Sequence, residues 1–180
     1  MRSEIGIGIV TIGLLAGCGA PGHSHFDPMS VKDIHAMQLM DPGIAQCHGP
    51  SAADGQALAE ATSRMRASRG LPPVSSSPAL NRAAAAHACD MARRGRMTHV
   101  GSTTSGPAQR VKAEGYRPML TAENIAAGPF SRSRVLHEWN VSQGHLDNIL
   151  IPQVREVGIG QAVGPDDKTV FWAAVYSAQR

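Results

Sequence analysis

Three separate segments carry side chains capable of acid–base chemistry or metal binding: His99 in "MTHVGST", Glu123 in "TAENIAAG" and His145 in "SQGHLDNIL". A neutral imidazole can act as a general base or bind a metal ion. His99 follows the end of an expected helix, and Glu123 lies beside Asn124 in a segment expected to be irregular. Each candidate lacks a partner residue in its own segment, so no segment by itself decides between a catalytic role, metal binding and packing.

His145 has the most specific local setting of the three. Ser142 is expected to be the N-cap of a new helical turn, which places His145 at the third position of that turn. The positive end of the turn lowers the imidazole pKa and favours the neutral, metal-binding form. A histidine that only caps and packs is the alternative, and this segment alone favours it.

The elements that must position these residues follow from apolar spacing, capping residues and breakers. Helices are expected over 53–69, 78–95, 106–115 and 131–139. A β-hairpin is expected from 157–163 and 170–176, around the turn "GPDDK". Its second strand is apolar on both faces, so helices must cover the sheet from both sides. The expected fold class is α+β, a three-layer α-β-α sandwich with a central, mainly antiparallel sheet.

The first residues, "MRSEIGIGIVTIGLLAGCGA", have the pattern of a secretory signal peptide. The apolar run is too short to span a membrane, which takes about 20 residues. Residues 15–18, "LAGC", resemble a bacterial lipobox, in which Cys18 would be lipidated and would anchor the mature chain to a membrane. The alternative is a plain signal peptide with a chance cysteine. The expected organisation is a signal peptide over 1–18, a tether and lead-in over 19–49, and one globular domain over 50–180.

Lipidation of Cys18 would leave two of the three cysteines, Cys47 and Cys89. An exported protein meets an oxidising compartment, so these two are expected to form a disulfide bond. The alternative is two buried free thiols. In the tether, His23 and His25 are expected to be solvated, because no further metal ligand is near.

Composition argues against nucleic-acid binding. Charged residues make up 17% and aromatic residues 4% of the chain, and the net charge is +3. The one basic cluster, residues 93–96, is expected to lie at a helix C-terminus, where cations are favoured. Neither a basic face nor a base-stacking surface is expected.

Six motifs in order resemble the CAP superfamily of cysteine-rich secretory proteins, antigen 5 and pathogenesis-related proteins, in its bacterial SCP-like branch. The motifs are "HACDMARRGRMTHVGS", "GPAQRVKAEGY", "AENIAAG", "EWNVSQGHLDNIL", "REVGIG" and "FWAAVY", and the resemblance covers about residues 53–178. It implies the same sandwich, with a cleft containing two histidines and acidic residues. By motif, His99, Glu123 and His145 match the cleft residues, and together they would hold a divalent ion such as Zn²⁺ with one position open.

One departure from the family pattern weakens that metal site. Many eukaryotic members have a second glutamate where this chain has Ser142, and Glu138 precedes the helix tryptophan and is expected to point elsewhere. His87 and Asp90 resemble a family element and are expected to form a packing and hydrogen-bonding pair. With Asn124 and Ser142, they are expected to surround the cleft residues rather than to bind ligand. Any bound metal is therefore expected to be weakly held.

The function expected first is that of an exported, lipid-anchored binding module whose cleft takes a metal, a lipid or an envelope protein. The alternatives are a metal-dependent hydrolase that uses the same cleft and a purely structural triad. No G-x-S-x-G motif supports acyl transfer, and fold resemblance alone does not assign a reaction. The chain is expected to be a monomer.

Overall fold

The computed structural model of the protein describes Asp33 and residues 35–180. The expected signal peptide with Cys18, and His23 and His25 of the tether, lie outside the described residues. Within the described part, none of the helices has both the length and the apolar character that a membrane span requires.

Five helices and seven strands make up the described chain. The helices are α1 (Ala52–Ala67), α2 (Pro78–Arg94), α3 (Pro107–Ala113), α4 (Arg132–Val141) and α5 (Gln143–Ile149). The strands are β1 (Met37–Gln38), β2 (Gln46–Cys47), β3 (Ser75–Ser76), β4 (Arg96–Met97), β5 (Pro118–Gly128), β6 (Glu156–Val163) and β7 (Val170–Gln179).

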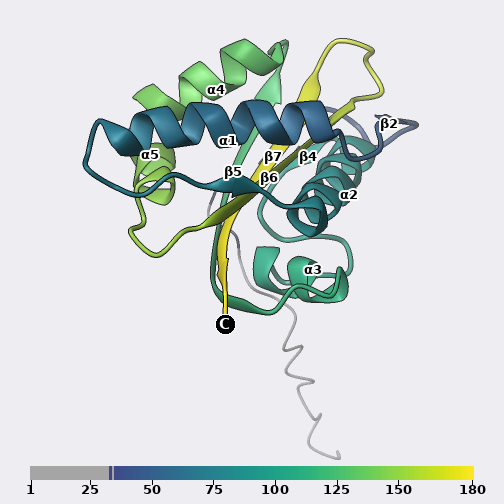
Figure 1. The fold of residues 1–180 in the computed structure, drawn as a ribbon. Helices are drawn as coiled ribbons and strands as arrows, with labels where there is room; N and C mark the ends of the chain where they lie inside the picture. The colour runs from purple at the N-terminus through teal and green to yellow at the C-terminus, as the bar shows by residue number, and fades with distance from the viewer. Residues whose placement is uncertain (1–32, 34) are drawn as a thin grey trace, which may run out of the picture.

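The main sheet has the strand order β2-β6-β7-β5, and β3 also pairs with β6, in parallel. All other pairs in this sheet are antiparallel, as expected. β1 and β4 form a separate two-stranded sheet. β7 is central and β5 is its long edge neighbour, so any side chain on β5 lies close to the rim of the sheet (Figure 1).

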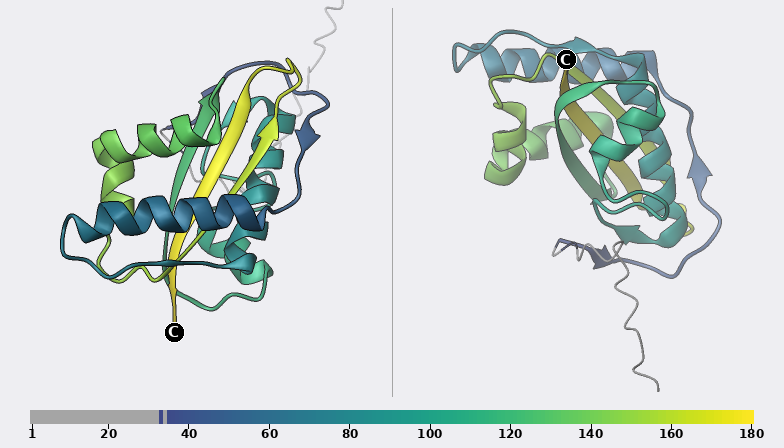
Figure 2. Two further views of the ribbon diagram at one scale, coloured as in Figure 1. Left: turned by 45° about the horizontal axis from the view of Figure 1, so that its top comes forward. Right: turned by 90° about the horizontal axis from the view of Figure 1, so that it is seen from below.

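The expected α-β-α sandwich is confirmed. α2 and α3 cover one face of the sheet, and α1, α4 and α5 cover the other (Figures 1 and 2). Successive side chains of β7 alternate between two buried clusters, as the period of a strand requires. Phe171, Ala173 and Val175 face α2, and Trp172, Ala174 and Tyr176 face α1, α4 and α5. A strand that is apolar on both faces is thus explained by helices on both faces.

α2 lies very close to β6, because small residues meet at the contact. A Cβ atom built on Gly160 would lie 2.2 Å from Cα of Ala85, and one built on Gly158 would lie 2.2 Å from the carbonyl carbon of Leu80. Both neighbours are backbone atoms that cannot rotate away. The alanine-rich face of α2 therefore brings the helix against the sheet, which places His87 within the core.

Local capping signals mark the helix ends. Ser51 accepts a hydrogen bond from the amide of Asp54 at the start of α1, and Pro78 occupies the first turn of α2. α2 ends at Gly95, whose φ of 60° lies in the left-handed region that glycine favours. Ser142 is the N-cap of α5, and His145 is the third residue of that helix.

The expectation of an irregular segment around Glu123 and Asn124 is wrong. Residues 118–128 form β5, which pairs with β7 along its length, with Glu123 opposite Val175 and Asn124 opposite Ala174. Small and polar residues hide the alternation in this strand, so its sequence lacks the apolar period that identified β6 and β7. The need for this strand could have been inferred from β7, because β6 pairs with only one edge of β7 and the other edge requires a partner strand.

The expected disulfide bond is present in the structure. Cys47 in β2 and Cys89 in α2 are bonded, with a Cα–Cα distance of 5.1 Å and a separation of 42 residues in the chain. The bond fixes the lead-in segment, which also pairs with β6 through Gln46, to the helix that carries His87. Part of the expected tether is thus built into the domain.

We expect the double substitution of Cys47 and Cys89 by serine to lower the free energy of unfolding by about 2–4 kcal/mol, because the unfolded chain gains loop entropy. Urea denaturation of oxidised parent and variant measures this loss. The parent in reducing buffer is the matched control and should resemble the variant. Equal stability of variant and oxidised parent would contradict the prediction.

Candidate functional site

His99, Glu123 and His145 line one cavity of about 640 Å³ at the edge of the sheet. His99 follows β4, Glu123 belongs to the edge strand β5, and His145 belongs to α5 on the other face of the sheet. The cavity therefore wraps around the rim of β5. The full lining consists of His35, Ala36, Met37, Met97, His99, Glu123, Ile125, Ser142, Gly144, His145 and Asn148.

Glu123 is the buried centre of an ion-pair network. Its Oε1 accepts a hydrogen bond from Nδ1 of His99 at 2.9 Å, and its Oε2 accepts one from Nη2 of Arg110 at 2.6 Å. Nε2 of His87 lies 3.7 Å from Oε1. The Glu123 side chain is 1% exposed. Burial raises the pKa of Glu123, but the hydrogen bond from His99 and the charge and hydrogen bond of Arg110 outweigh burial, so the net pKa is lowered and the carboxylate stays ionised.

His99 is oriented from two sides. Because a carboxylate only accepts, Nδ1 of His99 carries the hydrogen that Glu123 receives, and Nε2 is left for a ligand. The backbone amide of His99 donates to Oδ2 of Asp33 at 2.6 Å, and the Thr98 hydroxyl donates to the same oxygen. The lead-in segment thus holds the loop of His99 in place.

His145 is half-buried at the opposite wall of the cavity. Its Nδ1 lies 2.9 Å from Oγ of Ser142, so the side chain of Ser142 contacts the imidazole. The Ser142 side chain makes no capping hydrogen bond to the backbone of α5. Burial lowers the pKa of His145, and the backbone carbonyl of Ile125 opposes this effect only in part, so the net pKa is lowered. The imidazole is therefore neutral near pH 7, in the direction that the helix position predicts.

Two asparagines connect α5 to β5. Nδ2 of Asn124 donates to the backbone carbonyl of His145 at 3.1 Å and to the hydroxyl of Tyr176. Nδ2 of Asn148 donates to Oδ1 of Asn124 and to the backbone carbonyl of Glu123. Asn124 therefore links β5 to the backbone of His145.

His87 and Asp90 are both close to the site, but each bonds to other partners. Nε2 of His87 lies 2.9 Å from the carbonyl oxygen of Thr98. Oδ2 of Asp90 accepts from Nη2 of Arg94 and from the amide of Ser102. The expected hydrogen-bonding pair of His87 and Asp90 is therefore wrong. The loop after α2 folds back and supplies a closer partner to each side chain, the Thr98 carbonyl to His87 and the Ser102 amide to Asp90.

Arg110, Asp33 and His35 belong to the site and were not predicted from the sequence. Arg110 lies on the short helix α3, and its charge compensates Glu123 from 13 residues away. Asp33 and His35 come from the segment 19–49, which the Pro and Gly pattern predicted as a tether and lead-in without a role in the site. No local pattern marks any of the three, because their partners are distant in sequence.

The residues present do not fit the three-ligand metal site implied by the resemblance. Both carboxylate oxygens of Glu123 are engaged, and among the described residues no group of three or more His, Cys, Asp or Glu side chains is arranged to hold a metal ion. The contact to Nδ1 of His99 is instead the kind by which a carboxylate orients a ligand histidine. Only Nε2 of His99 and of His145 remain for a cation, so metal binding stays a prediction.

Solved structures share this fold. An extracellular protein containing an SCP domain from Bacillus anthracis superposes with a TM-score of 0.62 at 25% identity, over 71% of this chain and 41% of that one. An outer surface protein from Borrelia burgdorferi has a TM-score of 0.62 at 19% identity, over 72% of this chain and 95% of that one.

Sequence comparison identifies a relative and a family. The uncharacterised protein YkwD of Bacillus subtilis is 31% identical over 103 residues, which are 57% of this chain and 40% of YkwD, so the chain matches less than half of that relative. The family model described as "CAP: Cysteine-rich secretory protein family" matches residues 59–176. These residues include α2, His99 and His145 of the cavity and the buried Glu123. The chain therefore belongs to the cysteine-rich secretory protein (CAP) family.

Proposed function

We propose that this chain is an exported bacterial binding module that holds a small amphipathic ligand, such as a lipid, in the cavity at the edge of β5. The relatives support export, since one is an extracellular protein and another an outer surface protein. Lipidation of Cys18 would anchor the module to a membrane. Intact mass of the mature chain, compared with a Cys18→Ser variant, tests the anchor, and a parent that differs from the variant by no more than the cysteine-to-serine change itself contradicts it.

The chemistry of the cavity lining carries this proposal. The neutral His145 and the Glu123-bound His99 offer ring nitrogens to a polar head group, while Met37, Met97 and Ile125 offer apolar surface in the same cavity. A volume of about 640 Å³ lies in the range of about 300–1,000 Å³ typical of small-molecule sites. Apolar walls with a few convergent polar groups suit an amphipathic molecule better than a flat protein surface.

Calorimetric titration of the full chain with dodecanoate, below its micelle concentration, tests the proposal. We expect one-to-one binding that weakens at least about tenfold, about 1.4 kcal/mol, in Met97→Ala and in His145→Ala. Met119→Ala is the matched control, because Met119 is exposed on β5 and takes no part in the cavity lining. No saturable heat, or the same affinity in all variants, would overturn the proposal.

Zn²⁺ is proposed as a weak second ligand of the same cavity, bound through Nε2 of His99 and of His145. Zinc sites use three or four protein ligands, and two ligands support only weak binding. Titration with ZnCl₂ should therefore give weak binding that is lost in both His99→Ala and His145→Ala. Binding that survives both substitutions would place the ion elsewhere.

A hydrolase is the second candidate, because the Ser142 hydroxyl lies 2.9 Å from Nδ1 of His145 within the cavity. A serine beside a neutral histidine is the minimal arrangement for an activated nucleophile. The third, orienting carboxylate is not at His145, since Glu123 bonds to His99. Covalent labelling by a fluorophosphonate that disappears in Ser142→Ala would favour the hydrolase over the binding module. An unlabelled parent chain would exclude Ser142 as the nucleophile.

A further inference from the structure

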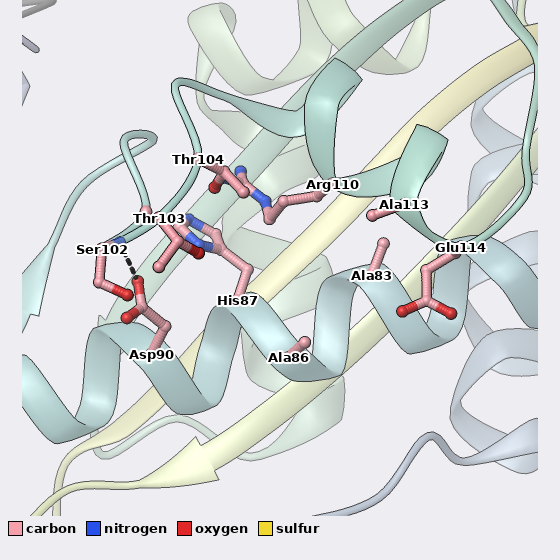
Figure 3. Close-up of a pocket in the computed structure, with 11 residues that line it drawn as sticks. Ala83, Ala86, His87, Asp90, Ser102, Thr103, Thr104, Arg110, Ala113 and Glu114 are labelled. Atoms are coloured by element: carbon pink, nitrogen blue, oxygen red, sulfur yellow. Dashed lines mark hydrogen bonds between the residues drawn. The ribbon is translucent and has the colours of Figure 1, made fainter. Parts of the chain in front are cut away.

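A second cavity, of about 190 Å³, lies between α2 and α3 (Figure 3). Its apolar side is made of three alanines, Ala83, Ala86 and Ala113. Its polar side includes His87 and Arg110, and the loop after Gly101 borders it with Ser102, Thr103 and Thr104. In Figure 3 the His87 imidazole extends from α2 toward this loop, and the Arg110 side chain reaches Thr104 from the opposite side.

Two buried polar atoms beside this cavity have no hydrogen-bond partner among the described residues. They are Nδ1 of His87 and Nε of Arg110. The two side chains are 0% and 6% exposed. Leaving such an atom unpaired costs about 1–3 kcal/mol, so buried polar groups without a partner are rare in native proteins. Both side chains also contact Glu123, which holds them next to each other.

The hydrogen-bonding roles of the two atoms are determined by their neighbours. Nε2 of His87 faces the carbonyl of Thr98, and a carbonyl only accepts, so Nε2 carries the ring hydrogen. Burial lowers the pKa of His87 to about 4, which keeps the ring neutral near pH 7. Nδ1 of His87 is then an acceptor, whereas Nε of Arg110 is always a donor. The partner of Nδ1 must therefore donate and the partner of Nε must accept, and a hydroxyl group can do either.

The surrounding charges disfavour ions of either sign. The charged groups that line the cavity are already paired within the protein, Asp90 with Arg94, Glu114 with Arg82 and Arg110 with Glu123, so none of the three is left to compensate the charge of an ion. The alanine side offers contact for short CH₂ groups, and the hydroxyls of Thr103 and Thr104 offer further hydrogen bonds. At about 190 Å³ the cavity is smaller than typical drug-sized sites, which start at about 300 Å³.

We propose that this cavity is a binding site for a small neutral hydroxylated molecule, a short polyol or alcohol, which donates to Nδ1 of His87 and accepts from Nε of Arg110. Both atoms are shielded from bulk water. The ligand therefore enters past the side chains of Thr103 and Thr104 and over the exposed Ala86. This site is separate from the β5-edge cavity and does not depend on the ligand proposed there.

Glycerol is the probe, followed through the histidine ring ¹⁵N resonances of the full chain by NMR. Sodium acetate and ethylammonium chloride serve as anionic and cationic probes of similar size. Ala86→Leu fills the mouth of the cavity from an exposed helix position, so it should block binding without disturbing the core. Ala53→Leu makes the same change at an exposed position of α1, outside the cavity lining.

We expect glycerol to shift the His87 Nδ1 resonance saturably, with binding at least about tenfold weaker in Ala86→Leu and unchanged in Ala53→Leu and His145→Ala. The His145→Ala arm separates this site from the β5-edge cavity. A saturable shift with acetate or ethylammonium in place of glycerol would overturn the ligand class. A linear, non-saturating response, or equal loss in Ala53→Leu, would overturn the site itself.

Discussion

Replacing Glu123 with glutamine is expected to lower the free energy of unfolding by about 3–5 kcal/mol, because it leaves the buried guanidinium of Arg110 without a counter-charge. The carboxylate is 1% exposed and accepts from both Arg110 and His99, so its removal also frees the His99 ring. Urea denaturation at pH 7 measures the loss. Failure of the variant to fold at all agrees with the prediction, and a loss below about 1 kcal/mol contradicts it.

A matched control and a pH series make this prediction specific. Glu114→Gln removes the exposed ion pair with Arg82 and should change stability by about 0–1 kcal/mol. The pKa of Glu123 is lowered from an ordinary value of 4.5, so its stabilising effect is fully present above about pH 4.5 and is lost as the pH falls through the lowered pKa. The stability difference between parent and Glu123→Gln should therefore shrink in acid, and a difference that grows would contradict the ion-pair explanation.

Replacing Arg66 with methionine is expected to cost more than about 4 kcal/mol, because hydrogen bonds to a charged group contribute about 1.5–3 kcal/mol each. Arg66 of α1 is 0% exposed. Its guanidinium donates to the backbone carbonyls of Pro72, Ile149, Ile151 and Val154, at 2.8, 2.9, 2.8 and 3.1 Å. The arginine thus joins α1 to the connector after it, to the end of α5 and to the segment before β6.

Methionine keeps much of the apolar stem of Arg66 but removes these hydrogen bonds. The carbonyls of Ile151 and Val154 each keep a second donor, the amide of Val154 and Nη1 of Arg155. Arg64→Met, at an exposed position of the same helix, is the matched control and should change stability by less than about 0.5 kcal/mol. Thermal and urea denaturation of both variants measure the effect. Similar stabilities of Arg66→Met and Arg64→Met would show that the carbonyls find other partners.

The helices and the hairpin could be predicted because their signals are local. Pro78 and Gly95 mark the two ends of α2, and the short apolar run of residues 170–176 after the turn "GPDDK" indicates a strand without knowledge of its neighbours. β5 could not be identified in this way, since its small residues pack under covering elements and carry no apolar period of their own. Its strand conformation follows from β7, which needs a partner on its second edge.

The sequence by itself determined the family, the three-layer architecture, the Cys47–Cys89 pair and the identity of His99, Glu123 and His145 as residues of one cavity. Only the tertiary structure decided what Glu123 does there. Arg110 of α3 forms an ion pair with its carboxylate, and His87 of α2 lies close to the same carboxylate. A charge cannot be buried without compensation, and the compensating group can come from any distance along the chain. Residue types therefore indicate the kind of site, whereas long-range contacts decide which atoms remain free to bind.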